Sequence, residues 1–180
     1  MLTVKERGLY AATMRHVQVW LMETLAAWVP TTPEMEAKLL FGEHIWDAAQ
    51  HADAFGKRTF ELRLPLQHSV APPDAYKRLL SDIAGLVPTP QRIAAVYDVL
   101  LPALTRRHGR YLELTDALGD APTVRILERE MADATRMIES ARQLRQQLPA
   151  LQQADRAWTD DLAAREAAME SIIASPAVAA

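Results

Sequence analysis

Residues 35–62 read MEAKLLFGEHIWDAAQHADAFGKRTFEL, and this stretch decides the class of fold. It contains no proline, and its residue types favour one long helix from Met35 to Leu62. His44, Asp47 and His51 are spaced three and four residues apart, so their side chains share one stripe of that helix. Two imidazoles and a carboxylate on one helical face are the strongest sign of chemistry in the chain.

The composition of the chain narrows the classes of protein to which it can belong. Of its 180 residues 49% are hydrophobic, enough for one core, so we expect one helical domain over residues 1–174 and a flexible tail at 175–180. The formal net charge of -3 favours neither nucleic acid nor an anionic membrane as a partner. The chain has no cysteine, so a bound metal would need nitrogen and oxygen ligands.

The N-terminal segment MLTVKERGLY lacks the basic-then-apolar order of a secretory signal. The most apolar run, residues 9–29, is interrupted by Arg15, His16 and Glu23, which argues against a membrane span. We therefore expect a cytoplasmic protein.

Proline and glycine divide the chain into a series of expected helices. The pattern predicts helices at about residues 5–29, 33–62, 74–85 and 90–118, a fourth long helix after Pro122, and a more polar helix from Pro149 to about Ile173. Thr32 is the expected N-cap of the second helix, with Pro33 in its first position. Pro102 predicts a kink near residues 99–103. The most direct interpretation of Trp20, Trp28 and Trp46 is that they anchor the core.

Two helical hairpins joined by a long crossover are the connectivity of ferritin-like bundles, and residues 5–145 resemble the ferritin-like superfamily. The resemblance implies an all-α fold, namely an up-down four-helix bundle with a long crossover carrying a short helix, plus a C-terminal fifth helix. Members commonly hold two iron or manganese ions, with one Glu on the first and third helices and Glu-x-x-His on the second and fourth. This chain departs from that motif, because Ala48 stands three residues before His51 and Asp133 three residues after Glu130.

Counting residues from the expected turns places the candidate ligands at similar depths. A helix rises about 1.5 Å per residue, so His16 and Asp47 lie about 24 Å from the turn near Thr31 and face each other across the first hairpin. His108 and Asp133 lie about 18 to 20 Å from the second turn. The candidate metal ligands are His16, Asp47, His51, His108, Glu130 and Asp133, with His44 as a supporting or spare group.

Imidazole and carboxylate ligands suit Fe or Mn, and the resemblance then implies redox or oxygen chemistry on a small organic substrate. No catalytic residue can be assigned. The chain has no Gly-rich phosphate loop, no Gly-x-Ser-x-Gly turn and no His-Glu-x-x-His motif.

Each candidate also has a plainer interpretation. The stripe of residues 44–51 is also explained as an Asp–His pair on a partly solvent-exposed face, and His16 with Glu23 as the one solvent-exposed strip of the first helix. In the segment RRHGR, residues 106–110, either His108 points into the bundle or the whole segment is solvent-exposed and merely basic. Helical neighbours of opposite charge favour a solvated face for Glu130 and Asp133.

Two other functions remain open on this sequence. The surplus apolar surface of the first helix and the Ala-rich segment 154–173 favour a non-enzymatic module that binds a protein partner or a second copy as a homodimer. A helical oxygenase resembling heme oxygenase would use the same polar residues, and only topology separates it from the ferritin-like interpretation.

Overall fold

A computed structural model describes residues 2–173, and the regular secondary structure of these residues is entirely helical, which confirms the all-α prediction. The α-helices are α1 (Val4–Trp28), α2 (Met35–Glu61), α3 (Asp74–Ala84), α4 (Thr89–Ile93), α5 (Leu101–Leu114), α6 (Ala121–Gln147) and α7 (Arg156–Ala167). Two short 3-10 segments, η1 (Val29–Thr31) and η3 (Pro149–Gln152), and a π-helical segment, η2 (Ala94–Leu100), complete them. The expected tail at 175–180 lies outside the described residues.

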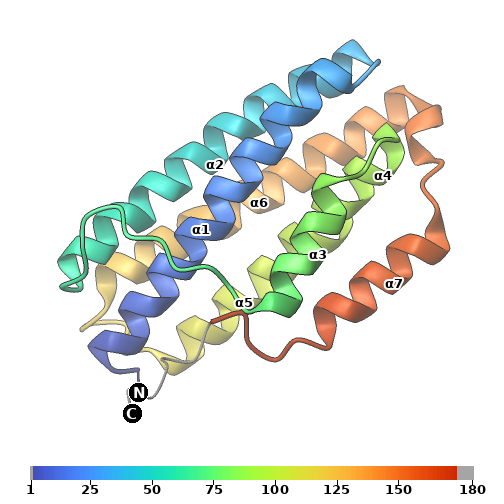
Figure 1. Ribbon diagram of the computed structural model, residues 1–180. Helices are drawn as coiled ribbons and strands as arrows, with labels where there is room; N and C mark the ends of the chain where they lie inside the picture. The colour runs from blue at the N-terminus through green and yellow to red at the C-terminus, as the bar shows by residue number, and fades with distance from the viewer. Residues whose placement is uncertain (1, 174–180) are drawn as a thin grey trace.

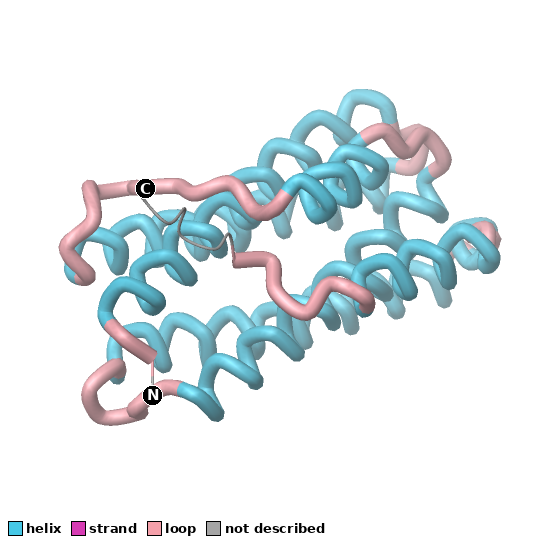
Figure 2. The backbone as a smooth tube through the Cα atoms, turned by 60° about the horizontal axis from the view of Figure 1, so that its bottom comes forward, coloured by secondary structure: helices cyan, strands magenta, loops and turns pink. Residues whose placement is uncertain are grey.

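Long helices lying side by side form the body of the molecule. Helices α1 and α2 make the most extensive contact, α5 packs on α6, and α2 packs on α6 between the two hairpins. The α1–α2 turn and the α5–α6 turn lie at opposite ends of the molecule (Figure 1). Residues 62–73 and α3 lead back along the helices to the start of α4, and α7 packs against α3 and η2. Most helical segments share one general direction, with loops at their ends and along one side (Figure 2).

Helix α1 begins at a complete capping box. The Glu6 backbone N–H donates to Thr3 Oγ1 at 3.3 Å, and the Thr3 backbone N–H donates to Glu6 Oε2 at 2.7 Å. Ala11, Ala12 and Met14 point in different directions around this helix, and all are buried. This burial on several sides agrees with its nearly uniform apolar sequence.

The sequence predictions about the start of the second helix, the end of the last helix and the burial of Trp46 are wrong. Helix α2 begins at Met35 instead of Pro33, because the Thr32 hydroxyl donates to the Trp28 carbonyl at 2.8 Å and does not cap the helix. The last α-helix ends at Ala167, well before Ile173. Trp46 lies on the outer side of α2 with 67% of its surface exposed, whereas Trp28 is buried as expected.

The helix that contains Pro102 is not broken there, because its backbone changes to a wider π-helical turn and then continues as an α-helix. Proline has no N–H and its ring crowds the carbonyl four residues earlier, which is Asp98 here. The residues just before Pro102 form η2, at whose end the Leu101 N–H bonds to the Val96 carbonyl, five residues back. Helices α4 and α5 are thereby joined into one rod ending at Leu114, so the expected irregularity begins earlier than residues 99–103 and the helix ends before Leu118.

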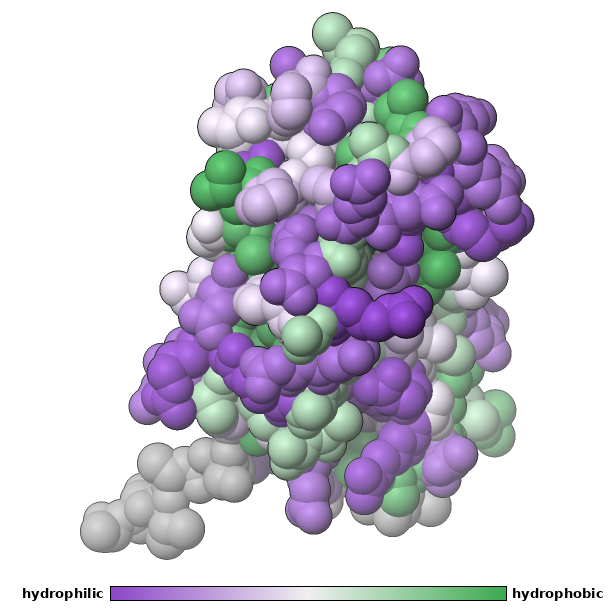
Figure 3. Space-filling view, turned by 90° about the vertical axis from the view of Figure 1, so that its right-hand side faces the viewer, coloured by the Kyte–Doolittle hydropathy of each residue, from purple (hydrophilic) through white to green (hydrophobic). Residues whose placement is uncertain are grey.

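The surface seen in Figure 3, which includes the α1–α2 turn and α7, is mainly hydrophilic with scattered apolar residues. No helix among residues 2–173 combines the length and the apolar character that crossing a membrane requires.

A buried carboxylate holds the α5–α6 end of the molecule together. Asp120 is fully buried and accepts hydrogen bonds from Tyr111 at 2.7 Å, Thr115 at 2.8 Å and Thr123 at 2.6 Å. Arg58 of α2 forms an ion pair with it at 2.8 Å. Burial raises the pKa of Asp120, but these hydrogen bonds lower it more, so the group stays ionised at neutral pH.

We expect Asp120→Ala to lower the free energy of unfolding by about 3 to 5 kcal/mol, because the substitution leaves the buried Arg58 guanidinium with only the exposed Glu61 as an anionic partner. Urea denaturation followed by circular dichroism measures the change. The exposed Asp160 is the control, and Asp160→Asn should change the free energy of unfolding by less than about 0.5 kcal/mol. Equal effects of the two substitutions would contradict the role assigned to Asp120.

Candidate functional site

A cluster of polar side chains lies among the long helices. Gln18 of α1, His51 of α2, His108 of α5 and Glu130 of α6 are all buried and line one small cavity. The cavity has a volume of about 10 Å³, close to the room that a single water molecule needs. Its remaining walls are mostly apolar, formed by Leu21, Leu101, Leu104, Thr105, Ala134 and Met137.

Glu130 is the central anion of this cluster. It accepts a hydrogen bond from the Gln18 side-chain amide, and its Oε1 lies 3.2 Å from His108 Nε2. Burial raises the pKa of Glu130, but the neighbouring imidazoles of His108 and His51 and the hydrogen bond from Gln18 offset this and leave its pKa below the ordinary value. An ionised carboxylate is therefore held inside the protein.

Tyr10 extends the cluster beyond His108. Its hydroxyl lies 2.7 Å from His108 Nδ1, and its ring packs on Tyr111 with centroids 4.2 Å apart. Burial raises the pKa of Tyr10 well above the usual value, so its hydroxyl keeps its proton at neutral pH. When this hydroxyl donates to Nδ1, the neutral imidazole carries its proton on Nε2, facing Glu130.

Three buried atoms around the cavity have no hydrogen-bond partner among the described residues: Gln18 Oε1, His108 Nε2 and Glu130 Oε2. The His108–Glu130 approach has the distance of an ion pair without the alignment of a hydrogen bond. Buried polar atoms without partners are uncommon and costly. Their concentration on one cavity indicates a site for a small polar species.

A second imidazole–carboxylate pair lies beside the first. His51 Nε2 is 2.9 Å from Asp133 Oδ2. Asp133 is also 3.2 Å from Arg136 and 3.7 Å from Arg129, so its charge is already compensated. Partial burial raises the pKa of Asp133, but the contacts with His51 and Arg136 lower it more.

The six ligands expected from the sequence therefore separate. His51, His108, Glu130 and Asp133 come together between α2, α5 and α6. Asp47 lies toward α6, but Arg136 binds it at 2.8 Å. His16 is half-buried, and the charges acting on it come from Glu23, Lys77 and Arg15.

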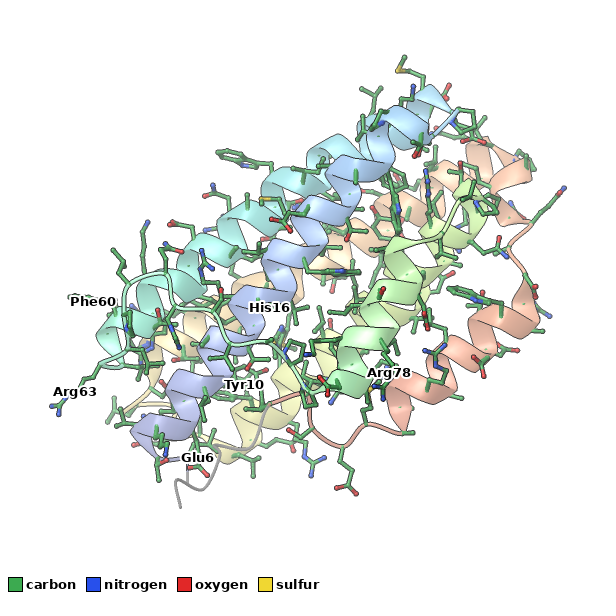
Figure 4. The ribbon with its side chains drawn as sticks, viewed as in Figure 1. Glu6, Tyr10, His16, Phe60, Arg63 and Arg78 are labelled. Carbon is green, nitrogen blue, oxygen red and sulfur yellow. The ribbon has the colours of Figure 1, made fainter. Side chains whose placement is uncertain are left out.

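The structure does not pair His16 with Asp47. Asp47 forms an ion pair with Arg136 of α6 at 2.8 Å, whereas burial lowers the pKa of His16 and the charged groups that act on it are Glu23, Lys77 and Arg15. Figure 4 shows His16 farther along α1 than Tyr10, the tyrosine that does reach the buried cluster. Counting residues gives the depth of a side chain in a helical hairpin but not the direction in which it points.

Within residues 2–173, no three or more histidine, aspartate or glutamate side chains are grouped so that they could hold a metal ion. A cation at the cavity would therefore need the Gln18 amide oxygen beside His108 and Glu130. Comparison of the chain with protein-family models, curated proteins and solved structures found no match.

Sequence reasoning did not select Gln18, Tyr10 or Tyr97. Gln18 carried a usable signal, since it interrupts the buried apolar stripe of Met14, Leu21 and Leu25 on one face of α1. A lone polar residue in such a stripe needs a partner inside the protein. The two tyrosines gave no comparable signal, because tyrosines are common in cores.

His44 forms a separate buried pair with Tyr97. Its Nδ1 lies 2.7 Å from the Tyr97 hydroxyl, and its Nε2 has no partner among the described residues. Burial lowers the pKa of His44 to about 4, with Asp47 opposing the shift and Arg136 adding to it. His44 is therefore neutral at pH 7.

The pKa of His44 predicts a loss of stability in mild acid. The unfolded chain takes up this proton near pH 6.5 and the folded protein only near pH 4, so folding is favoured fully above pH 6.5 and progressively less as the pH falls to 4. We expect wild type to lose about 3 kcal/mol more than His44→Gln over this interval. Urea denaturation at a series of pH values measures the difference, and parallel curves for the two proteins would refute the assignment.

Proposed function

We propose that this chain is a ferritin-like helical bundle that holds one divalent transition-metal ion, Fe²⁺ or Mn²⁺, at the cavity between Gln18, His108 and Glu130. The observation that carries the proposal is that each of these three buried residues has a polar atom without a hydrogen-bond partner among the described residues. The arrangement of hairpins, with their turns at opposite ends and a long connection between them, supports a ferritin-like topology.

The donor atoms suit such an ion in kind. One carboxylate, one imidazole nitrogen and one amide oxygen form a nitrogen and oxygen set, and His51 lines the same cavity as a further donor. Tyr10 supports His108 from behind, because its oxygen can accept the Nδ1 proton when Nε2 binds the ion. The two-ion arrangement is not supported, since Ala48 offers no ligand and arginines neutralise Asp133.

When bound here, a redox-active ion would supply electron transfer or oxygen chemistry to a small organic substrate. The residues of this chain surround the site with a mostly apolar lining. With Nε2 on the ion, His108 carries its proton on Nδ1, where the Tyr10 hydroxyl holds it and fixes the orientation of the imidazole.

We expect metal-free protein to bind one equivalent of Mn²⁺ per chain, measured by elemental analysis and electron paramagnetic resonance after desalting. Glu130→Gln removes the only carboxylate among the three proposed ligands, Gln18, His108 and Glu130, so the affinity should fall by at least about tenfold. Gln18→Glu adds a second carboxylate and should raise the affinity by a similar factor.

The control for this experiment is Glu128→Gln, at an exposed position of the same helix, which should bind Mn²⁺ like wild type. Absence of stoichiometric Mn²⁺ and Fe²⁺ from both wild type and Gln18→Glu would refute the proposal. The gain expected for Gln18→Glu keeps the experiment decisive if Glu130→Gln fails to fold.

The outer face of α2 favours a second candidate function, a homodimerisation module. Met35, Leu39 and Trp46 lie on one side of this helix with about two thirds of each exposed. Gly42 lies on the same side, and a Cβ atom there would meet nothing within 4 Å. In a two-fold contact, Trp46 of each copy could cover Gly42 of the other.

Light scattering coupled to size-exclusion chromatography tests this candidate. We expect wild type to elute with the mass of a dimer and Trp46→Gln with the mass of a monomer, because the substitution removes the largest apolar group of the face. Val87→Gln, which changes an exposed residue off the α2 face, should leave the dimer intact. A monomeric wild type at every concentration would exclude the homodimer.

A further inference from the structure

The three arginines of the segment RRHGR, residues 106–110, lie outside the buried polar cluster. His108 turns into the interior, while Arg106, Arg107 and Arg110 line a larger cavity beside α5. This cavity has a volume of about 690 Å³, within the range of roughly 300 to 1,000 Å³ typical of small-molecule sites.

Three parts of the chain form the larger cavity. The start of α1, one face of α5 and residues 166–173 make its walls. Much of the lining is apolar, contributed by Leu2, Leu9, Leu114, Met169, Ile172 and Ile173. These walls can accommodate an aliphatic group.

The three arginines that line this cavity, Arg106, Arg107 and Arg110, differ in how they are paired. The buried Glu166 accepts from Arg106 at 3.0 Å and from Arg107 at 3.0 Å, so two guanidinium groups share one carboxylate. Arg107 is further fixed by the Met169 carbonyl at 2.9 Å. Arg110 is exposed and has no ion pair among residues 2–173, so it can bind an anionic group.

Two carboxylates limit the charge that an anionic ligand can carry. Glu6 and Glu170 are the other acidic side chains of the lining, and both are exposed. Glu6 is bound to its own helix cap at Thr3. Their negative charge disfavours a dianion such as a phosphate monoester more than a carboxylate with a single charge.

We propose that this cavity binds an amphipathic monocarboxylate, with its aliphatic chain against the apolar walls and its carboxylate on Arg110 and Arg106. Tyr10 joins this site to the buried cluster, because it lines the cavity while its hydroxyl meets His108 at 2.7 Å. A bound ligand therefore lies one side chain, Tyr10, away from His108 and two side chains away from Glu130. The ligand site does not require a metal ion, so the proposal of ligand binding is tested independently of the proposed metal site.

Isothermal titration calorimetry with dodecanoate, below its micelle concentration and on metal-free protein, tests the inference. We expect saturable binding of one dodecanoate per chain. Dodecyltrimethylammonium, with the same chain and the opposite charge, should not bind. Absence of saturable dodecanoate binding, or equal binding of the two amphiphiles, would overturn the proposal.

Matched variants locate the binding. Ala167 is exposed and lines the cavity, whereas its exposed neighbour Ala168 does not, so Ala167→Trp should weaken dodecanoate binding at least about tenfold and Ala168→Trp should not. Arg110→Gln should weaken binding by about fivefold to tenfold, and Arg125→Gln, at an exposed site on α6, should have no effect. Unchanged binding in both Ala167→Trp and Arg110→Gln would place dodecanoate elsewhere and refute the site.

Discussion

The interior of the protein is constrained by two buried carboxylates, one at the N-cap of α6 and one within that helix. Asp120 and Glu130 are both buried, and a buried anion is tolerated only when other groups donate hydrogen bonds or positive charge to it. Asp120 takes these partners from α2 and α5, and Glu130 from α1 and α5. Apolar burial supplies the area that favours compaction, but these directional contacts select one register among the helices.

The positions of the helices could largely be predicted from the sequence, whereas the directions in which their side chains point could be predicted less well. Asp74 starts α3 and Gly85 follows it, as the proline and glycine pattern indicated. His44 and His51 are both buried, so their shared stripe faces inward. The same periodicity could not show that Trp46 faces solvent or that Asp47 pairs with Arg136 of α6, because it fixes the angle between residues of one helix and not the angle to neighbouring helices.

The polar partners inside the molecule were the least predictable part of the candidate site. Tyr10 and His108 are 98 residues apart in the chain, Gln18 and Glu130 are 112 apart, and His44 and Tyr97 are 53 apart. A single sequence records such complementarity only as isolated polar residues, each with several conceivable partners. Gln18 could have been noticed within its apolar stripe, but its partner could be identified only in three dimensions.

The π-helical segment η2 changes the side of the helix on which the following residues lie. Residues eleven apart in an uninterrupted α-helix fall on nearly the same side, yet Tyr97 meets His44 of α2 while His108 meets Tyr10 of α1 and Glu130 of α6. The wider turn inserts extra backbone between consecutive windings and so rotates one half of the rod relative to the other. Deleting a single residue from this stretch would therefore rotate the side chains after it by about 100° about the helix axis relative to those before it. No substitution of a side chain could reproduce this change.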